Sequence, residues 1–139
     1  MASYIPDGWT RDGYIAAAQP ADSGECLYDA LTFTYRPATR MENVKLDAAV
    51  RIEGDKSFNN PENAVKAEML ACKFIADHVV SWDLKAVGIH DVPVTADSCS
   101  RLQSELFNIL YLIIRGSRCN DKKPDATESP KSDAELQKN

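Results

Sequence analysis

The feature that most constrains the fold is an apolar helix that closes the stretch 81–116. Thr95 is a favoured N-cap residue, and Gly116 stands where a left-handed glycine commonly ends a helix. Large apolar side chains recur between them: Leu102, Leu106, Phe107, Ile109, Leu110, Leu112, Ile113 and Ile114. We therefore expect a helix over about 95–115, around which the rest of the chain is organised.

A second helix is expected over about 39–53. Thr39 and Glu42 have the spacing of a capping box, and Gly54 is expected to end the helix. One apolar stripe runs through Met41, Val44, Ala48 and Ile52. Leu46 and Val50 lie off that stripe, which indicates a second contact surface on the same helix.

A third helix is expected over about 61–80, because Asn60 is a good N-cap and Pro61 fits the first helical position. Its apolar stripe is broad: Val65, Met69, Cys72, Ala76 and Val79, widened by Leu70, Phe74 and Ile75. This breadth predicts a central, largely buried helix.

The remaining segments predict a small β-component and two polar ends. Residues 27–35 alternate like a strand, Asp12-Gly13 is typical of a hairpin turn, and residues 85–94 read as a short hairpin or turn. Residues 117–139 are expected to be a disordered tail whose removal leaves stability nearly unchanged. The expected fold is α+β and mainly α. It consists of a partly mobile N-terminal segment at 1–26, one domain at 27–116 and the tail at 117–139.

The composition and the absent motifs narrow the function classes. At 139 residues a single domain is expected, and a net charge of −5 argues against nucleic acid as partner. The chain shows neither a run of apolar residues long enough for a membrane span nor a signal peptide, which favours a cytoplasmic location. The absence of Cys-x-x-Cys, of clustered carboxylates and of phosphate-binding or nucleophile motifs predicts no metal, no cofactor and no enzymatic activity.

The candidate partner-binding residues are Tyr35, Arg36, Arg40 and Trp82. The first three surround a strand-to-helix corner, and tryptophan is enriched where interfaces bind most tightly. Trp82 could instead fill the core between two long helices, and the arginines could be solvated charges.

Several short pieces together resemble a known family. They are the corner Tyr35-Arg36-Pro37-Ala38-Thr39, the segment Ser81-Trp82-Asp83-Leu84, the turn Val92-Pro93-Val94-Thr95 and the helix end Ile113-Ile114-Arg115-Gly116. Over residues 29–116 this combination resembles small phage and prophage proteins of the tail assembly chaperone type. The resemblance implies a protein of the host cytoplasm that binds tape measure or tail tube protein during assembly and is absent from the virion.

Alternative functions remain open at this point. Residues 1–28 fall outside the resemblance and could mark a structural virion component, such as a tail or neck subunit. A small regulatory or inhibitor protein is a further alternative. The broad apolar helix faces predict self-association or capture of an apolar partner helix.

Overall fold

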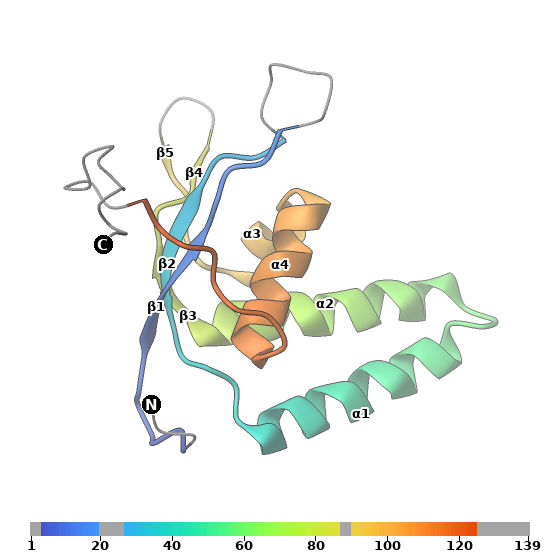
Figure 1. The fold of residues 1–139 in the computed structure, drawn as a ribbon. Coiled ribbons are helices and arrows are strands. Elements are labelled where there is room, and N and C mark those ends of the chain that lie inside the picture. Colours follow the sequence, from blue (N-terminus) through green and yellow to red (C-terminus); the bar gives the residue numbers. More distant parts are fainter. Residues whose placement is uncertain (1–3, 20–26, 87–89, 125–139) are drawn as a thin grey trace.

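The computed structural model of the chain describes residues 4–19, 27–86 and 90–124 (Figure 1). An antiparallel sheet in the order β1-β2-β3 carries helices on one face. The elements are β1 (Arg11–Ile15), β2 (Leu31–Tyr35), α1 (Arg40–Lys56), α2 (Pro61–His78), β3 (Val79–Trp82), β4 (Lys85–Ala86), β5 (His90–Asp91), α3 (Ala96–Ser100) and α4 (Ser104–Arg115). The expected α+β class, with most regular structure helical, is confirmed.

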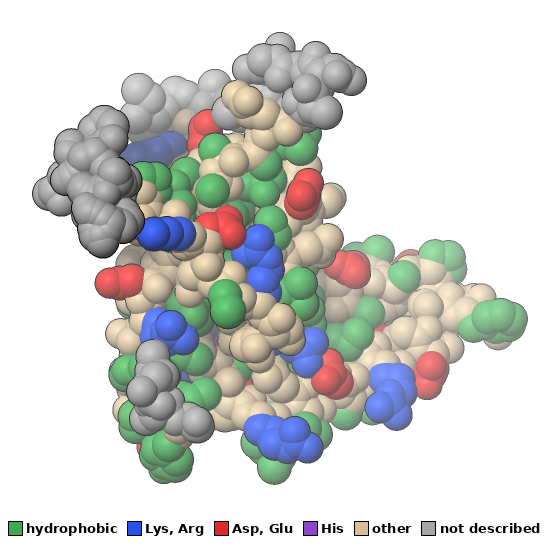
Figure 2. All heavy atoms as spheres, viewed as in Figure 1, with side chains coloured by type: hydrophobic (Ala, Val, Ile, Leu, Met, Phe, Trp, Pro, Cys, Tyr) green, Lys and Arg blue, Asp and Glu red, His purple; other side chains and the backbone are tan. Residues whose placement is uncertain are grey.

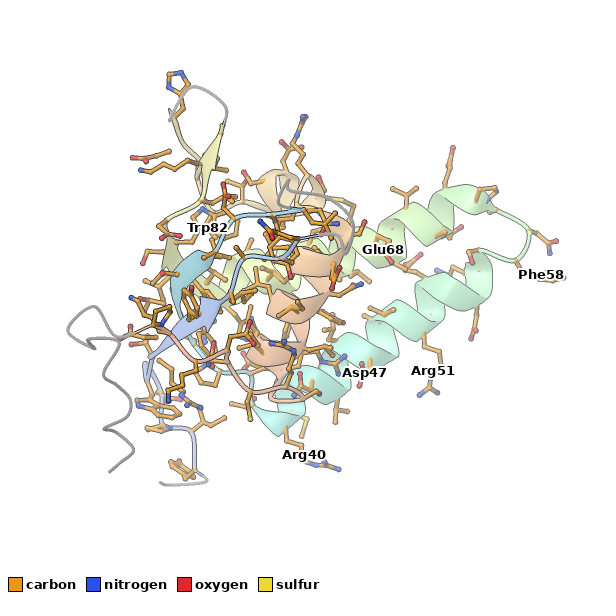
Figure 3. The ribbon with its side chains drawn as sticks, turned by 45° about the horizontal axis from the view of Figure 1, so that its top comes forward. Arg40, Asp47, Arg51, Phe58, Glu68 and Trp82 are labelled. Carbon is orange, nitrogen blue, oxygen red and sulfur yellow. The ribbon has the colours of Figure 1, made fainter. Side chains whose placement is uncertain are left out.

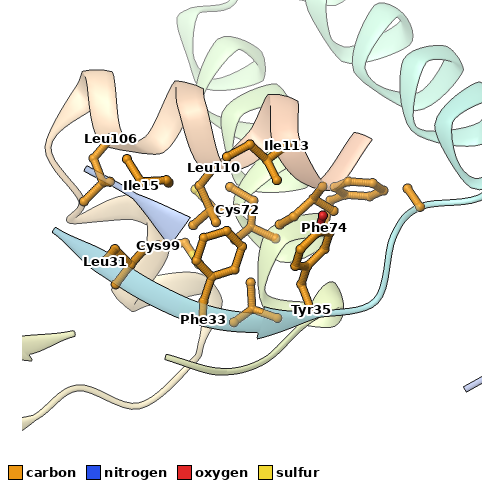
Figure 4. Close-up of a cluster of buried hydrophobic side chains, with 14 of the residues drawn as sticks. Ile15, Leu31, Phe33, Tyr35, Cys72, Phe74, Cys99, Leu106, Leu110 and Ile113 are labelled. Carbon is orange, nitrogen blue, oxygen red and sulfur yellow. The ribbon is translucent and has the colours of Figure 1, made fainter. Parts of the chain in front are cut away.

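The hydrophobic core lies between the sheet and α2, α3 and α4 (Figure 4). The alternation in β2 buries Leu31, Phe33 and Tyr35 on one face, as the strand pattern predicts. From the helices, Ile75 and Leu110 reach the same core and are fully buried. The last helix is therefore as central as the sequence indicates.

The Asp12-Gly13 pair does not form the expected hairpin turn, because both residues lie inside β1 and pair with β2. Gly13 pairs with Phe33, and a Cβ at Gly13 would lie less than 3.0 Å from three ring carbons of Phe33. The glycine thus leaves room for an aromatic ring in the core. Residues 11–15 consequently belong to the domain. The boundary expected at residue 26 therefore does not separate a mobile N-terminal segment from the domain.

Helix α1 differs from expectation in its end and in its buried face. It passes through Gly54 to Lys56, where the Ser57 N–H caps it. Leu46 is buried and Val50 packs on the core, whereas Met41 and other members of the predicted stripe are exposed. The second apolar face, not the first, contacts the body of the protein.

The other two expected helices are confirmed in place but are shorter. Helix α2 ends at His78, because the β-branched Val79 turns the chain into β3. The helix expected over 95–115 is divided into α3 and α4. Between them the Gln103 side chain accepts hydrogen bonds from the N–H groups of Glu105 and Leu106, and so starts α4 as a new N-cap.

The C-terminal segment departs from expectation over residues 117–121, which run along the outer edge of β1. The Tyr14 N–H donates to Asn120 Oδ1 at 2.9 Å, and the Asp121 N–H donates to the Tyr14 carbonyl at 3.0 Å. The Ala16 N–H donates to Asp121 Oδ2 at 2.9 Å. The tail boundary expected at Ser117 is therefore moved beyond Asp121, and the part of the predicted disordered tail at 125–139 lies outside the described residues.

Candidate interaction surface

Helices α1 and α2 form a helical hairpin that projects from the body of the molecule (Figure 1). Near its tip, Asn63 donates from Nδ2 to Glu53 Oε1 at 2.7 Å and ties the two helices together. Asn60 caps α2 by accepting from the Glu62 N–H. Phe58 stands at the tip with 88% of its surface exposed, and we call this hairpin the arm.

The inner face of α1 is fixed to α4 by a polar cluster around Arg115. Its guanidinium donates to Asp47 at 2.7 Å and to Asn43 at 3.0 Å, while the Asn43 amide donates to the Arg115 carbonyl. Burial would lower the pKa of Arg115, but the bond with Asp47 and the nearby Tyr111 raise it above its usual range. The guanidinium stays charged, and its bonds to Asn43 and Asp47 occupy this face of α1, which therefore packs inside the protein.

The outer face of α1 carries apolar side chains that the rest of the molecule does not cover. Met41, Val44 and Ile52 are 60%, 47% and 54% exposed, and Ala48 lies exposed between them. Figure 2 shows green and blue spheres side by side along this lower edge of the molecule. A row of apolar side chains on a projecting helix is typical of a surface that packs against another protein.

A groove of ≈ 570 Å³ lies on the other side of the arm, between α2 and the α3–α4 corner. Val65, Met69 and Phe107 line it with the sulfur-bearing side chains of Cys72 and Cys99. Burial raises the pKa of the Cys72 thiol and raises that of Cys99 to about 12. Both thiols are protonated at neutral pH, so the groove offers apolar contact rather than a nucleophile.

The base of α1 is anchored by the expected capping box, which the structure confirms. The Thr39 hydroxyl accepts from the Glu42 N–H, and the Glu42 carboxylate accepts from the Thr39 N–H at 2.9 Å. The carboxylate also lies 3.3 Å from Nε2 of the buried His78, an electrostatic contact rather than a well-formed hydrogen bond. His78 Nδ1 carries a proton, because it lies 2.8 Å from the Phe74 carbonyl oxygen, which can only accept.

Two of the candidate partner-binding residues have structural contacts. Tyr35 is 2% exposed, and its hydroxyl accepts from Asn120 Nδ2 at 3.4 Å. The Arg36 guanidinium donates to the Asp77 carbonyl at 2.9 Å, which satisfies an acceptor at the C-terminal end of α2. Arg36 therefore holds the strand-to-helix corner to α2, whereas Tyr35 contacts the C-terminal segment.

The other two candidates differ from each other. Trp82 is half-buried on β3 beside Phe33, and its Nε1–H donates to the Val92 carbonyl at 2.7 Å, which joins the β4–β5 segment to the sheet. It does not lie between the two long helices. Arg40 begins α1 and is exposed, pointing away from the body (Figure 3). Of the four, Arg40 is the one that lies on the outer face of the arm.

Sequence reasoning missed the outer face of α1 as a surface, although it identified the residues. The signal was present, because the helix has two apolar faces and a helix at the edge of a small domain can bury only one. Which of the two faced inward depended on the position of Arg115 in α4, 72 residues from Asn43.

No family model matches this chain, and no curated protein or solved structure does so either. Within residues 4–19, 27–86 and 90–124, His, Cys, Asp and Glu side chains form no group of three or more that could hold a metal ion. No helix in that part of the chain has the length and apolar character needed to cross a bilayer.

Proposed function

We propose that this protein is a non-catalytic protein-binding protein of the phage tail assembly chaperone type, and that it binds its partner through the arm. The observation that carries the proposal is the outer face of α1, where Met41, Val44 and Ile52 stand in solvent on a projecting helix. The inner face of the same helix is fixed to α4, so the outer face is held rigid and ready for contact.

The short motifs that resemble tail assembly chaperones support the finer assignment. Two of the four pieces lie in elements that build the arm and its base: the corner 35–39 leads into α1, and residues 113–116 end the helix that anchors it. A partner of this class is a tape measure or tail tube protein, bound in the host cytoplasm before assembly.

Co-expression with a phage tape measure protein tests the proposal. We expect a soluble complex that co-elutes from a sizing column, and expect the double variant Val44→Ser/Ile52→Ser to abolish it while its melting temperature stays near wild type. Val80→Ser is the control for an exposed valine, because Val80 is 57% exposed but lies on β3 and not on α1. An unchanged partner solubility with no complex would refute the chaperone role.

The alternative of a structural virion component makes a different prediction for the same protein. Mass spectrometry of purified particles would find it in stoichiometric amounts if it were a tail or neck subunit. Its absence from particles, combined with a complex in the cytoplasm, supports the chaperone proposal.

A further inference from the structure

The outer face of α1 carries unpaired positive charge as well as apolar side chains. Arg40, Lys45, Arg51 and Lys56 are all exposed, and none of them makes an ion pair with a residue that the structure describes. At about 100° per residue, Arg40 and Arg51 lie on one side of the apolar row, and Lys45 and Lys56 lie on the other. The row is thus flanked by cations on both sides.

The acidic residues of α1 do not neutralise this face. At about 100° per residue, Glu42, Asp47 and Glu53 each lie about 100° or more around the helix from the middle of the apolar row. On that side Asp47 also pairs with Arg115 at 2.7 Å. Asp55 makes no ion pair with a described residue and lies on the outer side of α1, one turn beyond Ile52, where it offsets one of the four cations. The outer face is therefore basic in a chain whose net charge is −5.

The apolar row has the dimensions of a helix-packing surface. From Met41 to Ile52 it extends about 16 Å, or three helical turns, with Val44 and Ala48 between the ends. The small Ala48 near its centre allows a second helix to approach closely. A three-turn partner helix with apolar anchors at positions i, i+3 or i+4, and i+7 would cover the row.

We infer that this face binds an amphipathic helix of the partner protein whose apolar stripe is flanked by Asp and Glu. The inference rests on the proposed function and specifies the chemistry of the partner. Acidic flanks would pair with Arg40 and Arg51 on one side and with Lys45 and Lys56 on the other, as charged residues beside a coiled-coil seam do.

Other occupants fit this face less well. A second copy of the chain would place cations opposite cations. An anionic membrane would attract the basic flanks, but the net charge of −5 opposes this, and the row lacks the Trp, Phe and Leu that anchor interfacial helices. Nucleic acid would leave the central apolar row without a contact.

The test uses the full chain and two synthetic helical peptides of 21 residues, identical except that Glu flanks the leucine stripe in one and Lys in the other (~six turns). Fluorescence anisotropy should show wild type binding the Glu peptide at least about tenfold more tightly, a preference that weakens at high salt. Arg40→Glu/Arg51→Glu should abolish the preference, because two glutamates would then balance Lys45 and Lys56, and Val44→Ser/Ile52→Ser should lose both peptides.

Lys122→Glu/Lys123→Glu is the matched control, because it changes the net charge equally at exposed residues outside the arm. Equal binding of the two peptides, no binding, or an equal effect of the control variant would overturn the inference. The inference would also be overturned if the wild-type protein bound phosphatidylglycerol vesicles, or formed a dimer, and the α1 variants abolished that association. If the co-expressed complex survives Arg40→Glu/Arg51→Glu, the acidic-helix inference fails while the proposed function stands.

Discussion

At the scale of single residues, the buried Phe33 ring occupies space that is free only because Gly13 has no side chain. Phe33 is buried and its ring lies 5.3 Å from that of Tyr35, so it has little space into which to move. The Asp-Gly pair that is typical of a turn is used here to seat an aromatic ring under a strand.

Gly13→Ala is therefore expected to destabilise the protein by about 1–3 kcal/mol through overpacking. Gly54→Ala is the opposite control, because its Cβ would meet no atom within 4 Å in a helix, and it should stabilise by about 0.4–1 kcal/mol. Thermal melts of both variants check the pair. If Gly13→Ala has the melting temperature of the wild type, the Phe33 ring can move aside and the overpacking argument is wrong.

At the scale of elements, α1 depends on a cap that is also an electrostatic site. Burial tends to raise the pKa of Glu42, but the hydrogen bond from the Thr39 N–H and the nearby His78 hold that pKa below its usual range. A carboxylate with a lowered folded pKa adds stability above its unfolded pKa, and that stability is lost as the pH falls through the folded value.

We expect the free energy of unfolding to fall as the pH drops from about 6 to about 3, and expect Glu42→Gln to flatten part of this fall. Glutamine can still accept from the Thr39 N–H, so the cap remains while the titration is removed. Urea unfolding of both proteins over this pH range measures the difference. Parallel pH profiles for the two would show that Glu42 does not contribute.

At the scale of the whole molecule, the segment 117–121 closes one edge of the sheet. It satisfies main-chain groups of Tyr14 and Ala16 that would otherwise face solvent at an edge strand. The sequence predicted a dispensable tail from Ser117, because this segment has no apolar periodicity. Asn120 and Asp121 act through hydrogen bonds instead, which an apolar pattern does not reveal.

Two truncations separate these regions. Removal of residues 125–139 should leave the melting temperature near wild type, whereas removal of 117–139 should cost about 2–4 kcal/mol, from several lost hydrogen bonds. Asn120→Ala/Asp121→Ala in the full chain should reproduce much of the second effect. Equal melting of the two truncated proteins would mean that 117–121 contributes nothing to the fold.

The sequence by itself determined the elements that depend on local chemistry. Thr39 with Glu42, Asn60 with Pro61, and Gly116 mark helix ends through contacts within a few residues, and the alternation in 31–35 defines β2. These signals act over one or two turns of chain, so they can be recognised without knowing the rest of the fold.

Only the tertiary structure decided which apolar face of α1 is buried, and hence where the candidate surface lies. Leu46 and Val50 point inward because Asn43 and Asp47 on that side meet Arg115 of α4, a contact between segments far apart in sequence. Periodicity is the same for both faces of such a helix, whereas the partner across the contact is not encoded locally. The row from Met41 to Ile52 became a surface because another element took the opposite side.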